Sequence, residues 1–358
     1  MLAFKHHHYV ASLRTKKGEF DAVKRLPTDV LERFTPLWEA QPTDDTSSGQ
    51  DPSKPLDEIL EKTAMGIHTA SNGLKGFVDC RLLHKSRRRS TGNHPIQWLC
   101  GRAATLGTIL TPVVGLDSDS AYIAAARSAH ASTASDIALR LDVADPLATS
   151  TATVTALVAA LGVTYESLHL ILDLGYLDSP LSLPVSLPTR LNRVLALGAW
   201  KSVTLMSGAI PETYSRLKPG LVSIGRFEWP VWCGLVAAGV LSRRPAFGDY
   251  GLSHAKYKFI PIWATGSAKI RYSDLGAYLI FLGRSLKSKH SGGYGQFPVL
   301  AAQAAAHPSY RGVSYSAGDK RISDCASRVV KTGNATTWVE ASTNLHIAYV
   351  ARLVPTVP

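Results

Sequence analysis

Charged side chains follow or end a series of short apolar segments in the first two thirds of this 358-residue chain. They are Lys16, Glu19, Glu39, Asp79, Arg81, Arg140, Asp142, Asp173, Arg226 and Glu228. Carboxylates gathered in one place can hold Mg²⁺ through oxygen ligands or act as general acid and base. Arginines beside them suit a phosphate or carboxylate substrate, because a guanidinium binds such groups bidentately. The alternative is a structural ion-pair network that satisfies buried charges.

From this set we predict a site with catalytic, substrate-binding and nucleic-acid-binding members. The predicted catalytic residues are Glu39, Asp79, Asp173 and Glu228. The predicted substrate-binding residues are Lys16, Arg81, Arg140, Arg226, Trp229, Asp249, Tyr250, Arg271 and His346. The predicted nucleic-acid-binding residues are the basic run Lys85, Arg87, Arg88 and Arg89, for which a solvated loop is the alternative. A Mg²⁺ cofactor is compatible with the carboxylates, but the sequence assigns no ligand set.

Two local clusters sharpen this prediction, each with a simpler alternative. Arg226 and Glu228 leave a predicted strand and enter a helix with a proline in its first turn, and a capping role would explain Glu228 equally well. Asp249 and Tyr250 stand between two glycines in what the sequence suggests is a turn. In that turn the two side chains would reach the site from the cap. The alternative is that Asp249 only stabilises the turn, as aspartates commonly do.

The apolar segments alternate with helix-like stretches eight times before residue 240, and eight such units are what a (β/α)₈ barrel requires. The segments are His8–Leu13, Thr35–Glu39, Gly76–Arg81, Ile109–Val114, Ile137–Asp142, Leu168–Asp173, Ser202–Ser207 and Val222–Arg226. We therefore predict an α/β fold with a TIM-like barrel over residues 1–240, closed by pairing of the last segment with the first. Because such barrels place their chemistry at the C-terminal ends of the strands, the charged residues should meet at one mouth.

Residues 241–358 lack this alternation and predict an α+β extension that caps or flanks the barrel. Its predicted strands are Phe259–Trp263, Ala268–Tyr272 and Tyr278–Gly283, and its predicted helices are Gln296–Ala306, Asp319–Val330 and Trp338–Leu353. A polar stretch, Gln41–Pro55, predicts a long loop at the mouth.

Composition limits the partners. The chain has 39 Lys and Arg against 27 Asp and Glu, a net charge of +12 that favours anionic partners such as nucleic acid or a nucleotide. No stretch predicts a membrane span or a signal peptide, and the four scattered cysteines are typical of reduced thiols, so we expect a cytoplasmic protein without a membrane partner. The phosphate-loop, nucleophile-elbow and zinc-hydrolase motifs are absent.

Several stretches in order along the chain resemble the beta protein family of phages, prophages and bacterial defence islands. They are YVASLRTKKGEFDAVKRLP…FTPLWEA, LHLILDLG, GRFEWPVW, FGDYG, AKIRY, SAGDKRI and GNATTWVEASTNLHI. The chain departs from the family pattern in Asp178–Pro188, and Leu345 stands where the family tends to have a histidine before His346. The resemblance implies a barrel-like fold and a setting in phage–host conflict, without a defined reaction.

Two functions are therefore open. The first is a barrel-mouth enzyme of a defence or toxin–antitoxin module that acts on a phosphate-bearing substrate. The second is a binding module that holds a partner protein or nucleic acid through its basic face. An enzyme predicts that Glu39, Asp79, Asp173 and Glu228 share a pocket, whereas a binding module predicts that they are dispersed or neutralised by Arg140 and Arg226.

Overall fold

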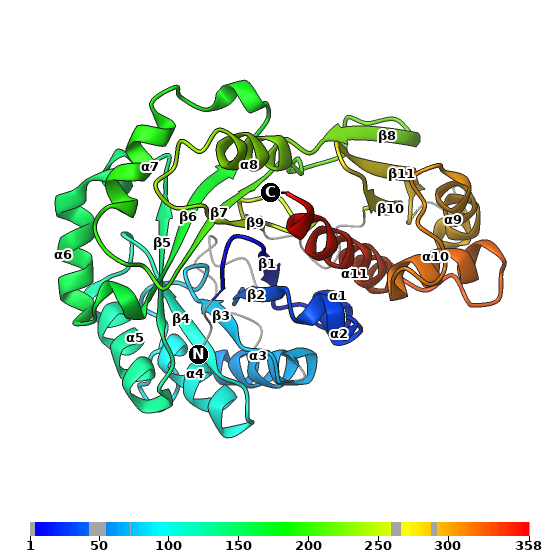
Figure 1. The fold of residues 1–358 in the computed structure, drawn as a ribbon. Helices are drawn as coiled ribbons and strands as arrows, with labels where there is room; N and C mark the ends of the chain where they lie inside the picture. Colours follow the sequence, from blue (N-terminus) through cyan, green and yellow to red (C-terminus); the bar gives the residue numbers. More distant parts are fainter. Residues whose placement is uncertain (1–3, 43–54, 72, 259–265, 288–291, 358) are drawn as a thin grey trace.

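Eight parallel strands close into a barrel in the computed structural model of the chain, which describes residues 4–42, 55–71, 73–258, 266–287 and 292–357. The barrel strands are β1 (Tyr9–Arg14), β2 (Phe34–Glu39), β3 (Gly76–Asp79), β4 (Leu110–Val114), β5 (Ile137–Asp142), β6 (Leu168–Tyr176), β7 (Ser202–Gly208) and β9 (Ala246–Asp249). Each pairs in parallel with its neighbours, and β9 closes the ring between β7 and β1. The predicted fold class, a TIM-like α/β barrel, is confirmed (Figure 1).

The predicted eighth strand is wrong. Val222–Arg226 overlaps β8 (Gly220–Gly225), which pairs with β11 (Ala277–Ser285) in a separate antiparallel sheet, and β10 (Ser267–Ser273) forms its other edge. A barrel strand is covered on both faces, whereas β8 carries exposed or half-buried residues along its length. The short β9 segment, which the sequence suggested was a turn, is buried throughout. The barrel sheet thus ends after residue 240, beyond the predicted range.

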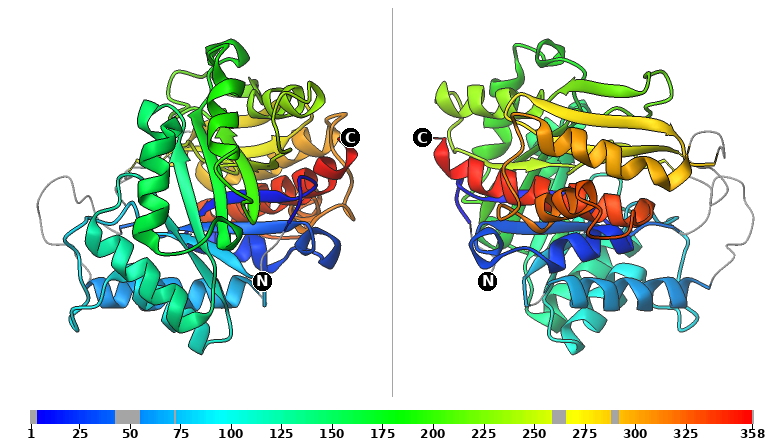
Figure 2. Two further views of the ribbon diagram at one scale, coloured as in Figure 1. Left: turned by 60° about the vertical axis from the view of Figure 1, so that its left-hand side comes forward. Right: turned by 90° about the vertical axis from the view of Figure 1, so that its right-hand side faces the viewer.

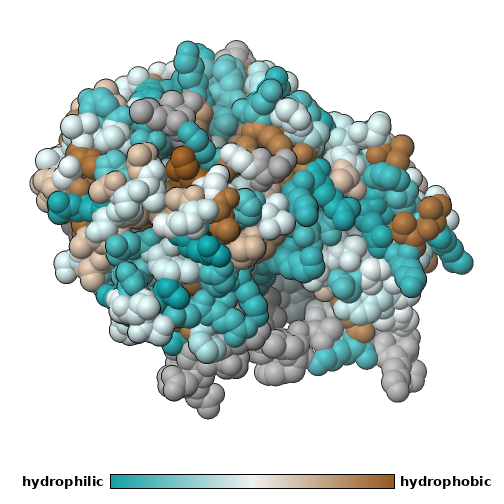
Figure 3. All heavy atoms as spheres, turned by 90° about the horizontal axis from the view of Figure 1, so that it is seen from below, coloured by the Kyte–Doolittle hydropathy of each residue, from teal (hydrophilic) through white to brown (hydrophobic). Residues whose placement is uncertain are grey.

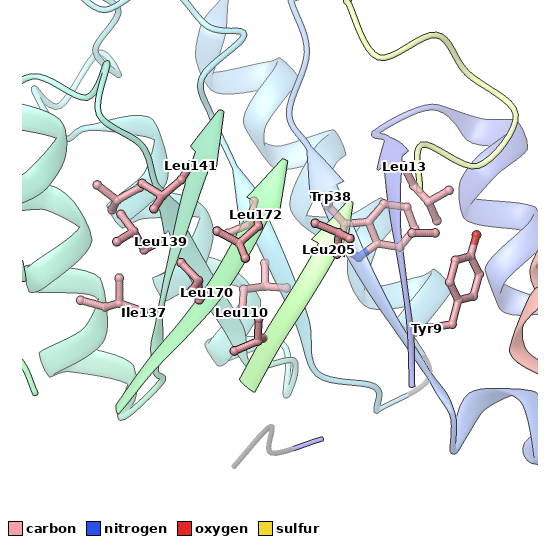
Figure 4. Packing of buried hydrophobic residues seen from close by; sticks show 14 of the residues in the cluster. Tyr9, Leu13, Trp38, Leu110, Ile137, Leu139, Leu141, Leu170, Leu172 and Leu205 are labelled. Atoms are coloured by element: carbon pink, nitrogen blue, oxygen red, sulfur yellow. The ribbon is translucent and has the colours of Figure 1, made fainter. Parts of the chain in front are cut away.

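Helices connect the barrel strands and cover their outer side. They are α1 (Lys17–Lys24), α2 (Thr28–Leu31), α3 (Leu56–Ser71), α4 (Pro95–Thr105), α5 (Ser120–Thr133), α6 (Thr151–Leu161), α7 (Leu187–Leu195) and α8 (Glu228–Ala237). Between strands and helices lies the main apolar core; Figure 4 shows Ile137, Leu139 and Leu141 of this core along β5. A second layer fills the barrel interior, built from Val10, Leu37, Phe77, Val113, Ala138, Ile171, Met206 and Tyr250.

The C-terminal segment lies against one flank of the barrel. The helices α9 (Phe297–Ala306), α10 (Ala317–Ala326) and α11 (Ala335–Leu353) share an apolar cluster with the antiparallel sheet, and α11 packs against α1 and β1 (Figures 1 and 2). Five of the six elements predicted for this segment are present as two strands and three helices. The sixth, Phe259–Trp263, and most of the predicted loop Gln41–Pro55 lie outside the described residues.

The surface is mainly polar. The face in Figure 3 is largely hydrophilic, with apolar residues in small scattered groups. No described helix is long and apolar enough to cross a membrane. The four cysteines are unpaired, and three of them are buried.

Candidate functional site at the barrel mouth

The barrel mouth holds a cluster of three carboxylates, three guanidiniums and one phenol, called the mouth cluster below. Its members are Arg14, Glu39, Asp79, Arg81, Arg140, Asp173 and Tyr250. In a strand, alternate side chains point to opposite faces. Glu39 is two residues after Leu37, and Asp79 is two residues after Phe77, both of which belong to the interior layer. Arg140 and Asp173 likewise come two residues after Ala138 and Ile171 of the interior layer, so their side chains also point into the barrel. The strands therefore bring all of these groups together above that layer.

Arg140 is the centre of the mouth cluster. Its Nη1 donates to Glu39 Oε1 at 2.8 Å and to Asp79 Oδ2 at 3.1 Å, and its Nε donates to Asp173 Oδ2 at 2.9 Å. Burial alone would lower the pKa of Arg140, but Asp173, Tyr250 and Asp79 outweigh it and raise that pKa. Burial would likewise raise the pKa of Asp173, yet Arg140 and Arg81 hold it below its ordinary value. Asp173 is therefore held as a buried ion.

Every carboxylate oxygen in the mouth cluster already accepts a hydrogen bond from the protein. Glu39 binds Arg81 and Arg140 through Oε1 and Arg14 through Oε2. Asp79 binds the Arg81 amide and Arg140, and Asp173 binds Tyr250, the Gly175 amide and Arg140. A Mg²⁺ ion needs free oxygen ligands, so this donor set does not fit it. Among the described residues, no group of three or more His, Cys, Asp and Glu side chains is placed to hold a metal.

Arg226 and Glu228 lie elsewhere, in a second buried cluster between the barrel and the C-terminal segment. This flank cluster consists of Tyr9, Arg226, Glu228, Asp249, Ser273, Tyr278 and His346. Arg226 Nε donates to Glu228 Oε1 at 3.1 Å, and the Tyr278 hydroxyl donates to the same oxygen at 2.7 Å. The predicted common pocket with Glu39 is not formed, because β8, which precedes these residues, is not a barrel strand.

Asp249 and Tyr250 point to opposite sides of the barrel wall. Tyr250 enters the mouth cluster, whereas Asp249 faces outward and accepts from the Tyr9 hydroxyl at 2.6 Å. His346 Nε2 lies 3.0 Å from Asp249 Oδ2, and His346 Nδ1 lies 2.6 Å from Ser273 Oγ. This Ser-His-Asp order matches a hydrolytic triad, but all three residues are 0% exposed, so no substrate reaches Ser273. The flank cluster joins the C-terminal segment to the barrel.

Trp229, a predicted substrate-binding residue, also lies away from the mouth cluster and packs in the apolar core. It is buried, and its ring lies 5.2 Å from Phe247 and 5.4 Å from Trp232. It therefore packs against the outer side of β9, away from the mouth cluster.

Glu228→Gln should accordingly lower stability. The substitution keeps an oxygen for Tyr278 but leaves the buried Arg226 without its counter-ion, which we expect to reduce the free energy of unfolding by about 1–3 kcal/mol. Urea unfolding followed by circular dichroism measures this loss. Unchanged stability together with a lost activity would return Glu228 to the catalytic set.

Most of the predicted nucleic-acid loop serves the fold. The Arg89 guanidinium donates to Asp57 at 2.9 Å and stacks on Trp98 at 4.3 Å, and Arg88 Nη1 donates to the carbonyls of Lys85 and Arg87. Lys85 Nζ donates to the Asp117 carbonyl. Binding of nucleic acid by this run stays a prediction, and Arg87 is its cleanest test position, because the side chains of Lys85, Arg88 and Arg89 also hold the loop.

A basic cavity of about 450 Å³ opens beside the mouth cluster, between the loops that follow β7 and β9 and one face of β10. Its charged lining consists of Arg14, Lys16, Lys256, Lys258, Lys269 and Arg271, with His254 and a single carboxylate, Glu212. Glu212 pairs with Lys258 at 2.5 Å. Within the described part of the chain, Lys16, Lys256, Lys269 and Arg271 form no salt bridge, so the cavity keeps an excess of positive charge.

Strand β10 supplies two of these cations through its alternation. Ala268, Ile270 and Tyr272 are buried in the apolar cluster of the C-terminal segment, whereas Ser267, Lys269 and Arg271 face the cavity. Burial, followed by the charge of Arg271, lowers the pKa of Lys269 to about 8. Sequence reasoning found Lys16 and Arg271 but missed Lys269, although its spacing from Arg271 in a strand was a usable signal.

Glu19 lies behind the cavity wall. It is in the first turn of α1 and is 6% exposed, and its Oε2 accepts no hydrogen bond from the described residues. Burial raises its pKa to about 7, although the charges of Arg14, Lys16 and Arg271 act in the opposite direction. Arg14, Lys16 and Arg271 of the cavity thus all interact electrostatically with this one buried carboxyl group.

The fold and site define a (β/α)₈ barrel with a flanking antiparallel sheet, a neutralised mouth cluster and a basic cavity beside it. The chain belongs to the Beta protein family, whose sequence profile matches residues 9–352. Comparison with curated proteins gives no match. Among solved structures, the chain is similar to a 3-keto-D-glucoside 4-epimerase from E. coli in its apo form, at 11% identity and a TM-score of 0.33, over 70% of this chain and 94% of that one. A TM-score this low supports no argument about either chain.

Proposed function

We propose that this protein binds a phosphate-bearing ligand in the basic cavity beside its barrel mouth. The carrying observation is the excess of cations there, of which Lys16, Lys256, Lys269 and Arg271 have no salt-bridge partner among the described residues. Such a lining attracts an anion and offers it charge-assisted hydrogen bonds. The mouth cluster offers no comparable site, because its carboxylates and guanidiniums neutralise each other. This neutralisation favours a binding module over a metal-dependent enzyme.

The setting in phage–host conflict, as part of antiviral defence or a toxin–antitoxin module, remains part of this proposal. It rests on the resemblance to the beta protein family and not on the site. A partner protein of such a module is likewise a proposal.

A reaction on the bound ligand is the second candidate, and Glu19 is the observation that favours it. A buried carboxyl group with a pKa of about 7 is poised to accept or donate a proton near neutral pH. Turnover of labelled nucleotides by the wild type that Glu19→Gln abolishes would support this candidate, whereas turnover that survives the substitution would remove Glu19 from it.

Charge removal tests the proposed binding. Pyrophosphate should bind to the wild type, and the double substitution Lys269→Met and Arg271→Met should weaken binding at least roughly tenfold, because each charged hydrogen bond contributes on the order of 1.5–3 kcal/mol. Isothermal titration calorimetry measures the affinity, which should fall as salt is raised.

Lys17→Met is the matched control. Lys17 adjoins Lys16 in sequence, but its side chain is 78% exposed and pairs with Asp21 outside the cavity. It removes one positive charge, against two in the double variant, without touching the cavity, so pyrophosphate binding should be nearly unchanged. An equal loss in both variants would mean that net charge, and not this cavity, attracts the anion.

A further inference from the structure

Of the four described lysines that line the basic cavity, Lys269 alone is half-buried, whereas Lys16, Lys256 and Lys258 are exposed. We propose that the Lys269 Nζ forms a Schiff base with the carbonyl carbon of a phosphate-bearing aldehyde or ketone. This inference rests on the proposed phosphate binding and adds the chemical class of the ligand and the atom that captures it. Proteins commonly use a buried lysine beside another cation for this chemistry.

Strand β10 and the Tyr214 ring hold Lys269 at the cavity wall. The strand neighbours Ala268 and Ile270 are buried in the apolar cluster of the C-terminal segment, so the alternation of the strand turns Lys269 to the cavity. Its Nζ lies 5.3 Å from the centre of the Tyr214 ring, which itself packs against the apolar cluster that includes Ile210. The amine is therefore positioned by packed elements and not by a carboxylate.

No carboxylate of the cavity lining holds Lys269 as an ammonium ion. Among the described residues its Nζ forms no salt bridge or hydrogen bond, and the lining carboxylate, Glu212, pairs with Lys258. Burial, followed by the charge of Arg271, lowers the pKa of Lys269 to about 8. The Tyr214 ring opposes this only weakly, because Nζ lies near the limit of roughly 6 Å for a cation–π contact.

A lowered pKa makes the amine nucleophilic near neutral pH. At pH 8 about half of the Lys269 side chains carry a free lone pair, compared with less than about 1% for an ordinary lysine. The neutral amine is the form that attacks a carbonyl group.

Arg271 supplies the phosphate partner on the same face of β10. Its Nη1 donates to the Leu252 carbonyl at 2.6 Å, which orients the guanidinium, and it forms no salt bridge among the described residues. Residues two apart on a strand are separated by roughly 6.5 Å, so one small molecule can meet both Arg271 and Lys269. The cavity volume of about 450 Å³ falls in the ordinary range for such ligands, roughly 300–1,000 Å³.

The covalent step needs only the lysine, the carbonyl compound and solvent protons. The Nζ lone pair attacks the carbonyl carbon, the carbonyl π electrons move to oxygen, and a proton passes from nitrogen to oxygen to give a carbinolamine. A second proton on this oxygen lets it leave as water while the nitrogen lone pair forms the C=N bond, and the nitrogen then returns a proton to solvent. One amine and one carbonyl group thus give one imine and one water, and nothing is oxidised or reduced.

Pyridoxal 5′-phosphate is the probe, because it carries an aldehyde and a phosphate in one small molecule. At pH 8, sodium borohydride should reduce the imine to a stable secondary amine, and peptide mass spectrometry should place the label on Lys269. Pyridoxal, which lacks the phosphate, should need at least roughly tenfold higher concentration for equal labelling, the loss expected for one charged hydrogen bond. Equal labelling by the two aldehydes, or a label on Lys16 or Lys256 in place of Lys269, would overturn the inference.

Lys269→Arg and Lys17→Arg are a matched pair of variants. Both keep the positive charge, but each removes one primary amine. Lys269→Arg should lose the label, whereas Lys17→Arg should keep it, because Lys17 is 78% exposed and lies outside the cavity. Labelling that survives Lys269→Arg would overturn the assignment. If Lys269→Arg does not fold, competition in the wild type replaces it: saturating pyrophosphate should suppress the label on Lys269, and labelling that ignores pyrophosphate would contradict the inference.

Calorimetric titration of the wild type with pyrophosphate tests the proposed function separately. If pyrophosphate binds and Lys269 is not labelled, the Schiff-base inference fails while phosphate binding stands. If pyrophosphate does not bind and Lys269 is not labelled, the proposed function fails as well.

Discussion

Replacement of Arg140 by methionine should lower the free energy of unfolding by about 3–5 kcal/mol, one of the largest effects expected of any single substitution in this protein. Arg140 is 4% exposed and binds three buried carboxylates, those of Glu39, Asp79 and Asp173. Methionine keeps much of the length of the side chain but none of its charge. The variant would therefore bury three carboxylates with two guanidiniums, and an uncompensated buried charge is strongly unfavourable.

Arg81→Met provides the control in the same cluster. Arg81 binds Glu39 at 2.9 Å, but its side chain is 30% exposed, so solvent screens part of its charge. Its loss should reduce the free energy of unfolding by only on the order of 1 kcal/mol. Urea unfolding at pH 7, followed by circular dichroism, compares the two variants. If both variants lose the same free energy of unfolding, the central, buried position of Arg140 does not make its contribution to stability larger than that of Arg81.

The pH dependence gives this prediction a second readout. Asp173 has a lowered pKa in the folded wild type, so its contribution to stability is present above the unfolded pKa of about 3.8 and is lost as the pH falls through the folded value. Without Arg140 the carboxylates bind protons more readily, which relieves the uncompensated charge. The difference in stability between wild type and Arg140→Met should therefore narrow as the pH falls from 7 towards 3. A constant difference would indicate lost packing instead of lost charge.

Strand periodicity was sufficient to predict most of the mouth cluster. Glu39, Asp79 and Asp173 end parallel strands in phase with interior residues, and parallel strands in a closed barrel bring such positions to one rim. Arg14 was missed, although it ends β1 in the same phase as Val10. That periodicity does not say which carboxylates remain free, because the pairing with Arg140 depends on side chains that cross the barrel.

The closing strand was missed because its glycines suggested a turn. A Cβ at Gly248 would lie 2.7 Å from Thr204 Cγ2 on β7, so glycine is required there by the close approach of two barrel strands. The β-branched segment at β8 looked more like a strand of the barrel than β9 did. Because the prediction placed β8 in the barrel instead of β9, it also placed Arg226 and Glu228 at the barrel mouth.

The basic cavity was beyond sequence reasoning for a different reason. Lys16 follows β1, whereas Lys269 and Arg271 lie on β10, about 250 residues later, and Tyr257 comes from the loop between β9 and β10. These positions meet only because the antiparallel sheet packs on this side of the mouth. No local pattern specifies that packing.

Glu19→Gln should make the protein more stable at pH 8, by up to roughly 3 kcal/mol. Burial raises the pKa of Glu19 from 4.5 to about 7, so the folded state holds a proton that the unfolded state has released. Stability from this group is fully present below pH 4.5 and is lost as the pH rises to about 7. Glutamine stays neutral and escapes that loss, so the stability gained by the variant should be absent below about pH 4.5 and should reach its full size above about pH 7.

Asp21→Asn on the same helix is the control for this prediction. The Asp21 side chain is 28% exposed and pairs with Lys17 at the surface, so its replacement should change stability little at either pH. Thermal unfolding at pH 4.5 and pH 8 measures both variants. If Glu19→Gln is instead less stable at pH 8, the carboxylate is a stabilising counter-ion of Arg14, Lys16 and Arg271. A gain at pH 8 would show that the chain retains a destabilising carboxyl group behind its basic cavity. Its negative charge should then weaken phosphate binding above pH 7, so pyrophosphate should bind more tightly to Glu19→Gln than to wild type at pH 8, and equally at pH 5.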